Sequence, residues 1–224
     1  MDQGAMNYVV RVLVQRILAL ILFWLGARSE LSWHVWIYFG TIFAISIAAS
    51  VIMLRVNPET LSQRGKVVTD SPLWDKVLLG SYWILHFFAI HWVAGREWQG
   101  SVPSPTLYWI GMILVVLSSL LAVSALAVNP FLESTSRIQA ERGQSVIATG
   151  VYGVVRHPTY AAVLLSALGI ALVFSTTLVA VTAGVISAII VLRTYLEDRM
   201  LRAHLAGYLE YAQKVRYRLL PYVW

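Results

Sequence analysis

Long apolar runs separated by short polar segments make up most of this chain. A helix needs about 20 apolar residues to cross a bilayer core that is about 30 Å thick. Four runs have that length, and each is predicted to form one transmembrane helix: residues 8–27, 33–54, 74–98 and 106–128. The first run contains Arg11, Gln15 and Arg16, so we expect its beginning to lie at the membrane interface.

A fifth apolar region, residues 160–192, is too long for one crossing and too short for two crossings with a long loop. Ser175, Thr176 and Thr177 near its middle favour a tight turn and a helix N-cap. The region is therefore predicted to be a helical hairpin of two short spans. The expected fold is all-α: a polytopic transmembrane bundle of about six spans, the last two forming the hairpin, followed by a cytosolic C-terminal helix.

The composition also indicates a membrane protein. The 224 residues are 58% apolar and 12% charged, whereas soluble domains average about 45–50% and about 25%. The chain has no cysteine, which excludes a disulfide-stapled module and any metal site built from thiolates, and no metal is expected. We expect one integral membrane domain, residues 1–224, with four spans in 1–128 and the chemistry in 129–224.

The basic residues indicate the topology. Of the 17 Lys and Arg residues, thirteen lie after the second span, between the fourth and fifth spans, or from Arg193 onwards. The loops on the opposite side hold only Arg28 and Arg96. The positive-inside rule then places both termini and the long polar segments in the cytoplasm. The net charge of +6 therefore indicates topology and attraction to anionic lipid, and no nucleic-acid partner is expected.

Polar residues gather between the fourth and fifth spans. Asn129-Pro130 is predicted to end the fourth span, and Gly143 and Gly150 are expected to form turns. Arg156-His157-Pro158 is typical of a helix start, where unpaired backbone N–H groups can bind an anion or a carboxylate-bearing cofactor. The same residues also suit the headgroup region of a membrane, so the local pattern leaves both interpretations open.

A second polar segment begins at Arg193, which shares a helix face with Glu197 four residues later. Read alone, this segment is a solvated helix with weak ion pairs of about 0.3–0.5 kcal/mol each. His86 and His91 lie within the third span, five residues apart, which is not the spacing of helical metal ligands. A structural role is expected for them.

Read together, GVYGVVRHPTY, RTYLEDRML and GYLEYAQKVRYRLLPYVW resemble the isoprenylcysteine carboxyl methyltransferase family of membrane enzymes. The resemblance covers about residues 129–224. It implies a membrane methyltransferase that uses S-adenosylmethionine without a Rossmann fold. Its acceptor would be lipophilic, with an isoprenylcysteine-like carboxylate as the first candidate. Arg-His-Pro-x-Tyr alone is shared by membrane sterol reductases and phospholipid methyltransferases.

The resemblance also implies roles for individual residues. The expected catalytic residues are Arg193, which would bind the substrate carboxylate, and Glu197, which would also bind the cofactor. Gln144 stands where the family usually has histidine, and Ala161-Ala162 where a glycine commonly follows, so the acceptor's identity stays open. The other expected cofactor-binding residues are Gln139, Gln144, Ser145, Val146, Ile147, Tyr152, His157, Pro158, Thr159 and Tyr160.

The sequence leaves three alternative functions open. One is an NADPH-dependent reductase of a sterol or enone, which shares the Arg-His-Pro-x-Tyr motif. Another is a methyltransferase that acts on a phospholipid amine or a small thiol. The third is a membrane carrier or scaffold without catalytic activity. The acidic pair near Arg193 favours a transferase, and the concentration of charges in the C-terminal third argues against a carrier.

Overall fold

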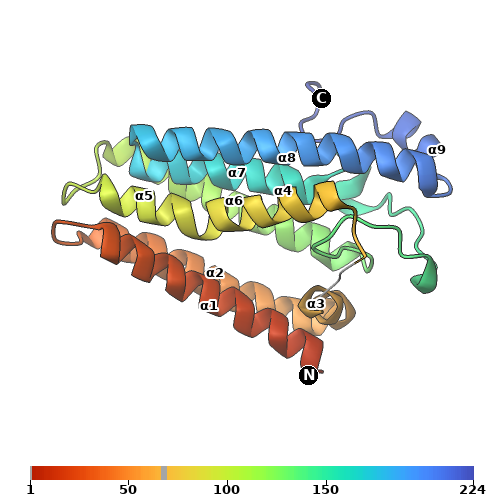
Figure 1. Ribbon diagram of the computed structural model, residues 1–224, viewed down its shortest axis with the longest axis horizontal. Helices are drawn as coiled ribbons and strands as arrows, with labels where there is room; N and C mark the ends of the chain where they lie inside the picture. The colour runs from red at the N-terminus through yellow and green to blue at the C-terminus, as the bar shows by residue number, and fades with distance from the viewer. Residues whose placement is uncertain (1, 67–69) are drawn as a thin grey trace.

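The computed structural model describes residues 2–66 and 70–224, and this part of the chain is helical without a β-strand. Long helices run side by side along the molecule, with α1 and α2 on one face and α8 along the opposite face (Figure 1). The helices of the bundle are α1 (Gln3–Gly26), α2 (Trp33–Val56), α4 (Leu73–Trp83), α5 (Ile90–Arg96), α6 (Pro105–Val128), α7 (Pro158–Phe174) and α8 (Thr177–His204). Two short helices, α3 (Pro58–Gly65) and α9 (Tyr208–Lys214), lie at the end where most polar segments gather.

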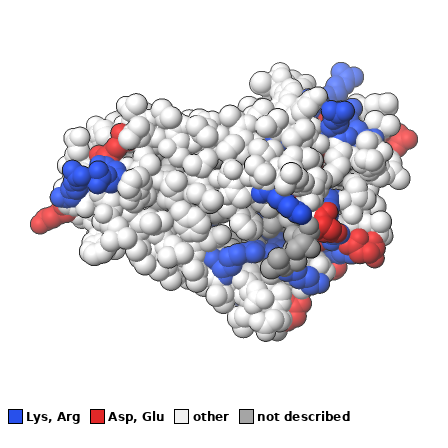
Figure 2. All heavy atoms as spheres, viewed as in Figure 1, with Lys and Arg blue, Asp and Glu red and all other residues white. Residues whose placement is uncertain are grey.

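The predicted spans are confirmed to within a few residues. Five helical stretches of the described chain are long and apolar enough to cross a membrane, and α7 is a shorter apolar helix of 17 residues. Lys, Arg, Asp and Glu lie mostly at the two ends of the molecule (Figure 2). Trp33, Trp36, Trp92 and Trp109 are exposed near helix ends, as expected of an interfacial aromatic belt. The protein is therefore a multi-pass membrane protein.

The predicted hairpin turn lies between α7 and α8. Ser175 adopts a left-handed conformation with φ of 50°, and α8 begins two residues later. Thr176 occupies the N-cap position without a side-chain cap, which differs from the sequence expectation. The carboxylate of Glu97 accepts instead from the backbone N–H groups of Leu178 and Val179, at 3.0 and 3.4 Å. The second arm is also longer than expected, since α8 has 28 residues and includes the segment from Arg193 to Glu197.

Helices α6 and α7 approach closely where the early part of α6 crosses the later part of α7. A Cβ atom added to Gly169 would lie 2.9 Å from the carbonyl oxygen of Gly111, which real Cβ atoms essentially never show. Small residues at such a crossing let two backbones approach closely within a membrane.

One span contains an irregular turn. Residues Ile84–Ala89 form a π-helical turn, η1, between α4 and α5. Such a turn places residues five apart on nearly the same face, because its hydrogen bonds run from i to i+5. His86 and His91 therefore both line one internal cavity of the bundle, a juxtaposition that regular helical spacing did not predict.

Candidate functional site

A cavity of about 1070 Å³, including its open mouth, lies at the polar end of the bundle. Its walls come from the α6–α7 loop, the start of α7, the second half of α8, and α4 and α9. Every site residue that the sequence predicted lines this cavity except Pro158, which begins α7. The structure thus brings together Gln139, Gln144, Ser145, Val146, Ile147, Tyr152, His157, Thr159, Tyr160, Arg193 and Glu197.

Arg193 is buried and held by a partner that the sequence did not reveal. Its Nε and Nη2 donate to Oδ1 of Asp75 at 2.9 and 2.7 Å, and Nη2 also donates to the carbonyl of Ser134 at 2.7 Å. Asp75, from α4, is completely buried, and its second oxygen accepts from the Ser136 amide at 3.0 Å. The positive charge of Arg193 is therefore compensated within the protein.

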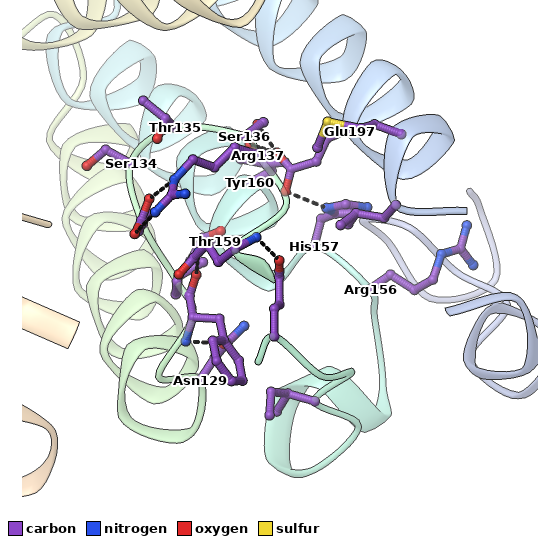
Figure 3. Close-up of a pocket in the computed structure, with 18 of the residues that line it drawn as sticks. Asn129, Ser134, Thr135, Ser136, Arg137, Arg156, His157, Thr159, Tyr160 and Glu197 are labelled. Carbon is purple, nitrogen blue, oxygen red and sulfur yellow. Dashed lines mark hydrogen bonds and ion pairs between the residues drawn. The ribbon is translucent and has the colours of Figure 1, made fainter. Parts of the chain in front are cut away.

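Glu197 presents a carboxylate to the cavity. One oxygen, Oε2, accepts from the hydroxyls of Ser136 and Tyr160. The other, Oε1, lies 3.9 Å from Nδ1 of His157, and the two side chains face one another in Figure 3. The His157 ring stacks on Tyr160, with centroids 5.6 Å apart and an interplanar angle of 7°.

Glu197 differs from the other acids around the cavity because no arginine lies within 4 Å of it in the described residues. Asp75 pairs with Arg193, and Glu133 receives two hydrogen bonds from Arg137 at 2.9 and 3.0 Å. Glu133 in turn raises the pKa of Arg137. Arginines around Asp198 pair with it in the same way. Glu197 is thus the acid best placed to attract a cationic ligand.

Arg156 has a different position from the one its motif suggested. Its Nε donates to Asp198 at 2.7 Å, and Nη1 donates to the carbonyls of Val215 and Arg216, each at 2.7 Å. Figure 3 shows Arg156 directed away from the labelled centre of the cavity. Through these hydrogen bonds, Arg156 holds the segment after α9 against the start of α7.

The backbone at the start of α7 also differs from the expectation of unpaired N–H groups. The amides of Arg156 and His157 donate to the carbonyls of Tyr217 and Arg218, each at 2.9 Å. The amides of Tyr160 and Ala161 both donate to the carbonyl of His157. These donors are occupied, so an anion at this position would have to be held by side chains.

The α6–α7 loop folds around Gln139 and Gln144. The backbone N–H of Gln139 donates to Oε1 of Gln144 at 2.7 Å, and the side-chain Nε2 of Gln139 donates to the carbonyl of Phe131 at 2.6 Å. Gly143 lies between them with φ of 61°, a conformation that suits glycine. Gln144 thereby shapes the loop that carries Ser145–Ile147 along the cavity wall.

The cavity has unsatisfied polar groups that fit a polar ligand. Thr135 Oγ1 and the Tyr152 hydroxyl are buried and have no hydrogen-bond partner in residues 2–66 and 70–224. Burial raises the pKa of Tyr152 and Tyr208, and that of Tyr211 to about 12, so all three phenols stay protonated near neutral pH. S-Adenosylmethionine carries an ammonium, a carboxylate, ribose hydroxyls and a sulfonium, and this donor set together with Glu197 fits such a molecule.

Two comparisons with known proteins found matches to this chain. Residues 106–206, which contain every predicted site residue, match the family model for phospholipid methyltransferases. No curated protein sequence matches the chain. Among solved structures, the chain is similar to the eukaryotic intramembrane Ras methyltransferase, isoprenylcysteine carboxyl methyltransferase, with 18% identity and a TM-score of 0.52. The similarity covers 94% of this chain and 73% of that one.

The chain is a polytopic helical membrane protein whose fold is similar to that of a membrane methyltransferase, and residues 106–206 carry the pattern of phospholipid methyltransferases. The predicted resemblance is confirmed in two ways. Helices α6 to α8 carry the phospholipid methyltransferase pattern, and the chain as a whole has the fold of an isoprenylcysteine carboxyl methyltransferase.

Proposed function

We propose that the protein binds S-adenosylmethionine in the cavity beside Glu197 and transfers its methyl group to a lipophilic acceptor. The observation that carries the proposal is Glu197, which lines the cavity without an arginine within 4 Å in the described residues, whereas the other lining acid, Glu133, pairs with Arg137. When bound, S-adenosylmethionine supplies a methyl group attached to positively charged sulfur. The carboxylate of Glu197 would attract the ammonium of this cofactor or accept from its ribose hydroxyls.

The neighbouring residues would position the two reactants. Ser136 and Tyr160 hold one oxygen of Glu197 and so fix its orientation. Tyr160 also keeps His157 stacked beside the same carboxylate, and Tyr152 offers a buried hydroxyl. Because methyl transfer is an in-line displacement, holding acceptor, methyl and sulfur in line supplies much of the rate.

A carboxylate of an isoprenylcysteine-like molecule is the first candidate acceptor. Such a group is already ionised at neutral pH, so it needs no general base. Arg193 lies in the same cavity and would orient the carboxylate through its remaining guanidinium edge. The fold match to an isoprenylcysteine carboxyl methyltransferase supports this candidate.

A phospholipid amine is the second candidate acceptor. It is favoured by the family model and by Asp75, which compensates the charge of Arg193 and so reduces its attraction for an anion. Methylation of an amine would require loss of a proton, and His157 and Glu197 are the groups in the cavity that are placed to accept it.

The site is proposed to face the cytoplasm, where basic loops concentrate. The cavity lies at the same end as the segments that follow α2, α6 and α8, which hold most of the arginine and lysine residues. The acceptor would then enter from the bilayer and the cofactor from the cytosol.

The first test is titration of the purified full-length protein with S-adenosylhomocysteine. We expect Glu197→Gln to weaken binding about tenfold or more, because it removes a charged acceptor worth about 1.5–3 kcal/mol. Glu210→Gln, an exposed residue of α9 outside the cavity, is the matched control and should bind normally. Absence of binding by the wild-type protein would end the proposal, and unchanged binding by Glu197→Gln would reject the site.

The acceptor is identified by a radiolabelled methyl-donor assay. An isoprenylcysteine analogue and phosphatidylethanolamine are offered separately to the wild-type protein in mixed micelles. Label that base releases as volatile methanol comes from a methyl ester and supports the carboxylate, whereas label that stays non-volatile, on the headgroup nitrogen, supports the amine.

A further inference from the structure

A second cavity, of about 1140 Å³ including its open mouth, lies among the helices of the bundle. It is bounded by α1, α2, η1 and α6, with contributions from α3, α4, α5 and α7. Much of its wall is apolar, for example Ile42, Met53, Val115 and Ile170. This size and lining suit the apolar body of a lipid-like molecule.

Cationic side chains project into this apolar space. Arg11, Arg16 and Arg64 line the cavity, and no acidic residue does. All 11 acidic residues of the chain lie in the described part, and none is within 4 Å of these three guanidinium groups. Basic side chains are visible on the face between α1 and α4 in Figure 2.

Backbone carbonyls already accept from two of these cations, since Arg11 donates to the carbonyl of Arg64, and Arg64 donates to the carbonyls of Leu132 and Glu133. Arg16 has fewer contacts with protein. Arg16, within α1, donates through Nε to the Ser46 hydroxyl at 3.1 Å and lies over the ring of Phe87 at 5.4 Å. Nδ1 of His86 and Nδ1 of His91 are buried and have no partner in the described residues. An ionised group inside a membrane is costly unless it is paired, so this cavity is built to receive a negative charge.

The two cavities adjoin one another. Arg64, Trp83 and Ser134 line both of them. The carbonyl of Ser134 accepts from Arg193, and Nε of Arg64 is buried without a partner in the described chain. A ligand seated in the second cavity would therefore reach the cavity that contains Glu197 by extending past these three residues.

We propose that the second cavity binds the methyl acceptor, and that the acceptor is an amphiphile with an acidic group, carboxylate or phosphate, distinct from the atom that is methylated. This inference rests on the proposed methyl-transfer function. Arg16 contacts the acidic group, Arg11 and Arg64 complete the positive wall, and the apolar body of the acceptor lies against α2 and α6. The unusual start of α1, with Arg11, Gln15 and Arg16, is thus part of a binding site: all three residues line the cavity.

The test measures binding of radiolabelled palmitate to the full-length protein in a neutral detergent. Unlabelled hexadecyl phosphate, hexadecanol and the acceptor found in the methyl-transfer assay are the competitors. We expect hexadecyl phosphate and the acceptor to displace palmitate, and hexadecanol to compete at least tenfold more weakly. Arg16→Gln should lower palmitate affinity about tenfold or more, whereas Arg28→Gln, an exposed arginine outside both cavities, should not.

Titration with S-adenosylhomocysteine separates this inference from the proposed function. Arg16→Gln should keep wild-type affinity for it, which also demonstrates that the variant is folded. If the wild-type protein binds S-adenosylhomocysteine but hexadecyl phosphate and hexadecanol displace labelled palmitate equally, the inference is overturned while the proposed function stands. Competition on the wild-type protein needs no variant, so the charge requirement is tested even if Arg16→Gln misfolds.

Discussion

Arg193 and Glu197 lie four residues apart on α8, yet the surrounding protein treats their charges differently. Arg193 is 3% exposed and bound to Asp75, whereas Glu197 has only hydroxyl donors and a histidine near it. A compensated arginine is well suited to fix neighbouring groups in place, and an unpaired carboxylate is suited to attract a cation. This difference supports the proposal that Glu197, rather than Arg193, attracts the charged part of the cofactor.

We expect Asp75→Asn to destabilise the protein strongly. The substitution leaves the buried Arg193 charge without its counter-ion, at a cost of about 3–5 kcal/mol, which corresponds to a fall in Tm of about 10 °C. The double variant Asp75→Asn/Arg193→Gln removes both charges and should recover part of this loss. Thermal unfolding in detergent micelles is measured for the wild-type protein, Asp75→Asn, Arg193→Gln and the double variant, and simple additivity of the two single changes would contradict the pairing.

The sequence predicted the members of the site that belong to local motifs, and it missed those that only the fold brings near. His157, Tyr160 and Glu197 were predicted because their motifs are contiguous. Asp75 lies 118 residues from Arg193 in the chain, and no local pattern connects them. The sequence signal that could have indicated Asp75 is its position near the start of an apolar span, since acidic residues there seldom occur without a partner.

The positions at which helices begin and end were the most predictable feature of this structure, because the length of a span follows from the thickness of the bilayer. Pro58, Pro105 and Pro158 each begin a helix, and α6 ends before Asn129-Pro130 as expected. The short helix α3 was missed, since eight polar residues have no membrane-length pattern. The length of α8 was underestimated because charged residues follow its apolar part without any break in the helix.

The α6–α7 contact gives a test with a matched control. Gly169→Ala should lower Tm by several degrees, because the added methyl group would lie 2.9 Å from the Gly111 carbonyl and force the helices apart. Gly184→Ala, on α8, adds the same methyl group where no atom lies within 4 Å and should have little effect. Equal Tm values for the two variants in detergent micelles would show that the helices do not meet closely at Gly169.

The molecule as a whole is asymmetric. The cavity that contains Glu197, the long polar segments and most of the charged residues lie at one end (Figures 1 and 2). This asymmetry follows from the distribution of basic residues that the sequence already displays. What the sequence could not provide was the second cavity, because it is formed by residues from eight helical segments that are spread along the chain.

The absence of cysteine makes the topology directly testable. A single cysteine at Lys214, exposed on α9, should react with a membrane-impermeant maleimide only after right-side-out vesicles are permeabilised. A cysteine at Arg28, exposed between α1 and α2, should react in intact vesicles. The reverse pattern would place the cavity on the outer side and contradict the proposed cytoplasmic orientation.

The π-helical turn at Ile84–Ala89 affects how the chain compares with its relatives. A π turn holds one residue more than a regular turn, so His86 and His91 occupy the positions that an i, i+4 pair occupies in an α-helix. A relative that lacks one residue here would keep both histidines facing the cavity in a continuous α-helix. A one-residue deletion within this turn is therefore expected to keep both histidines on the cavity side, and an alignment with such a relative should place the gap within the turn.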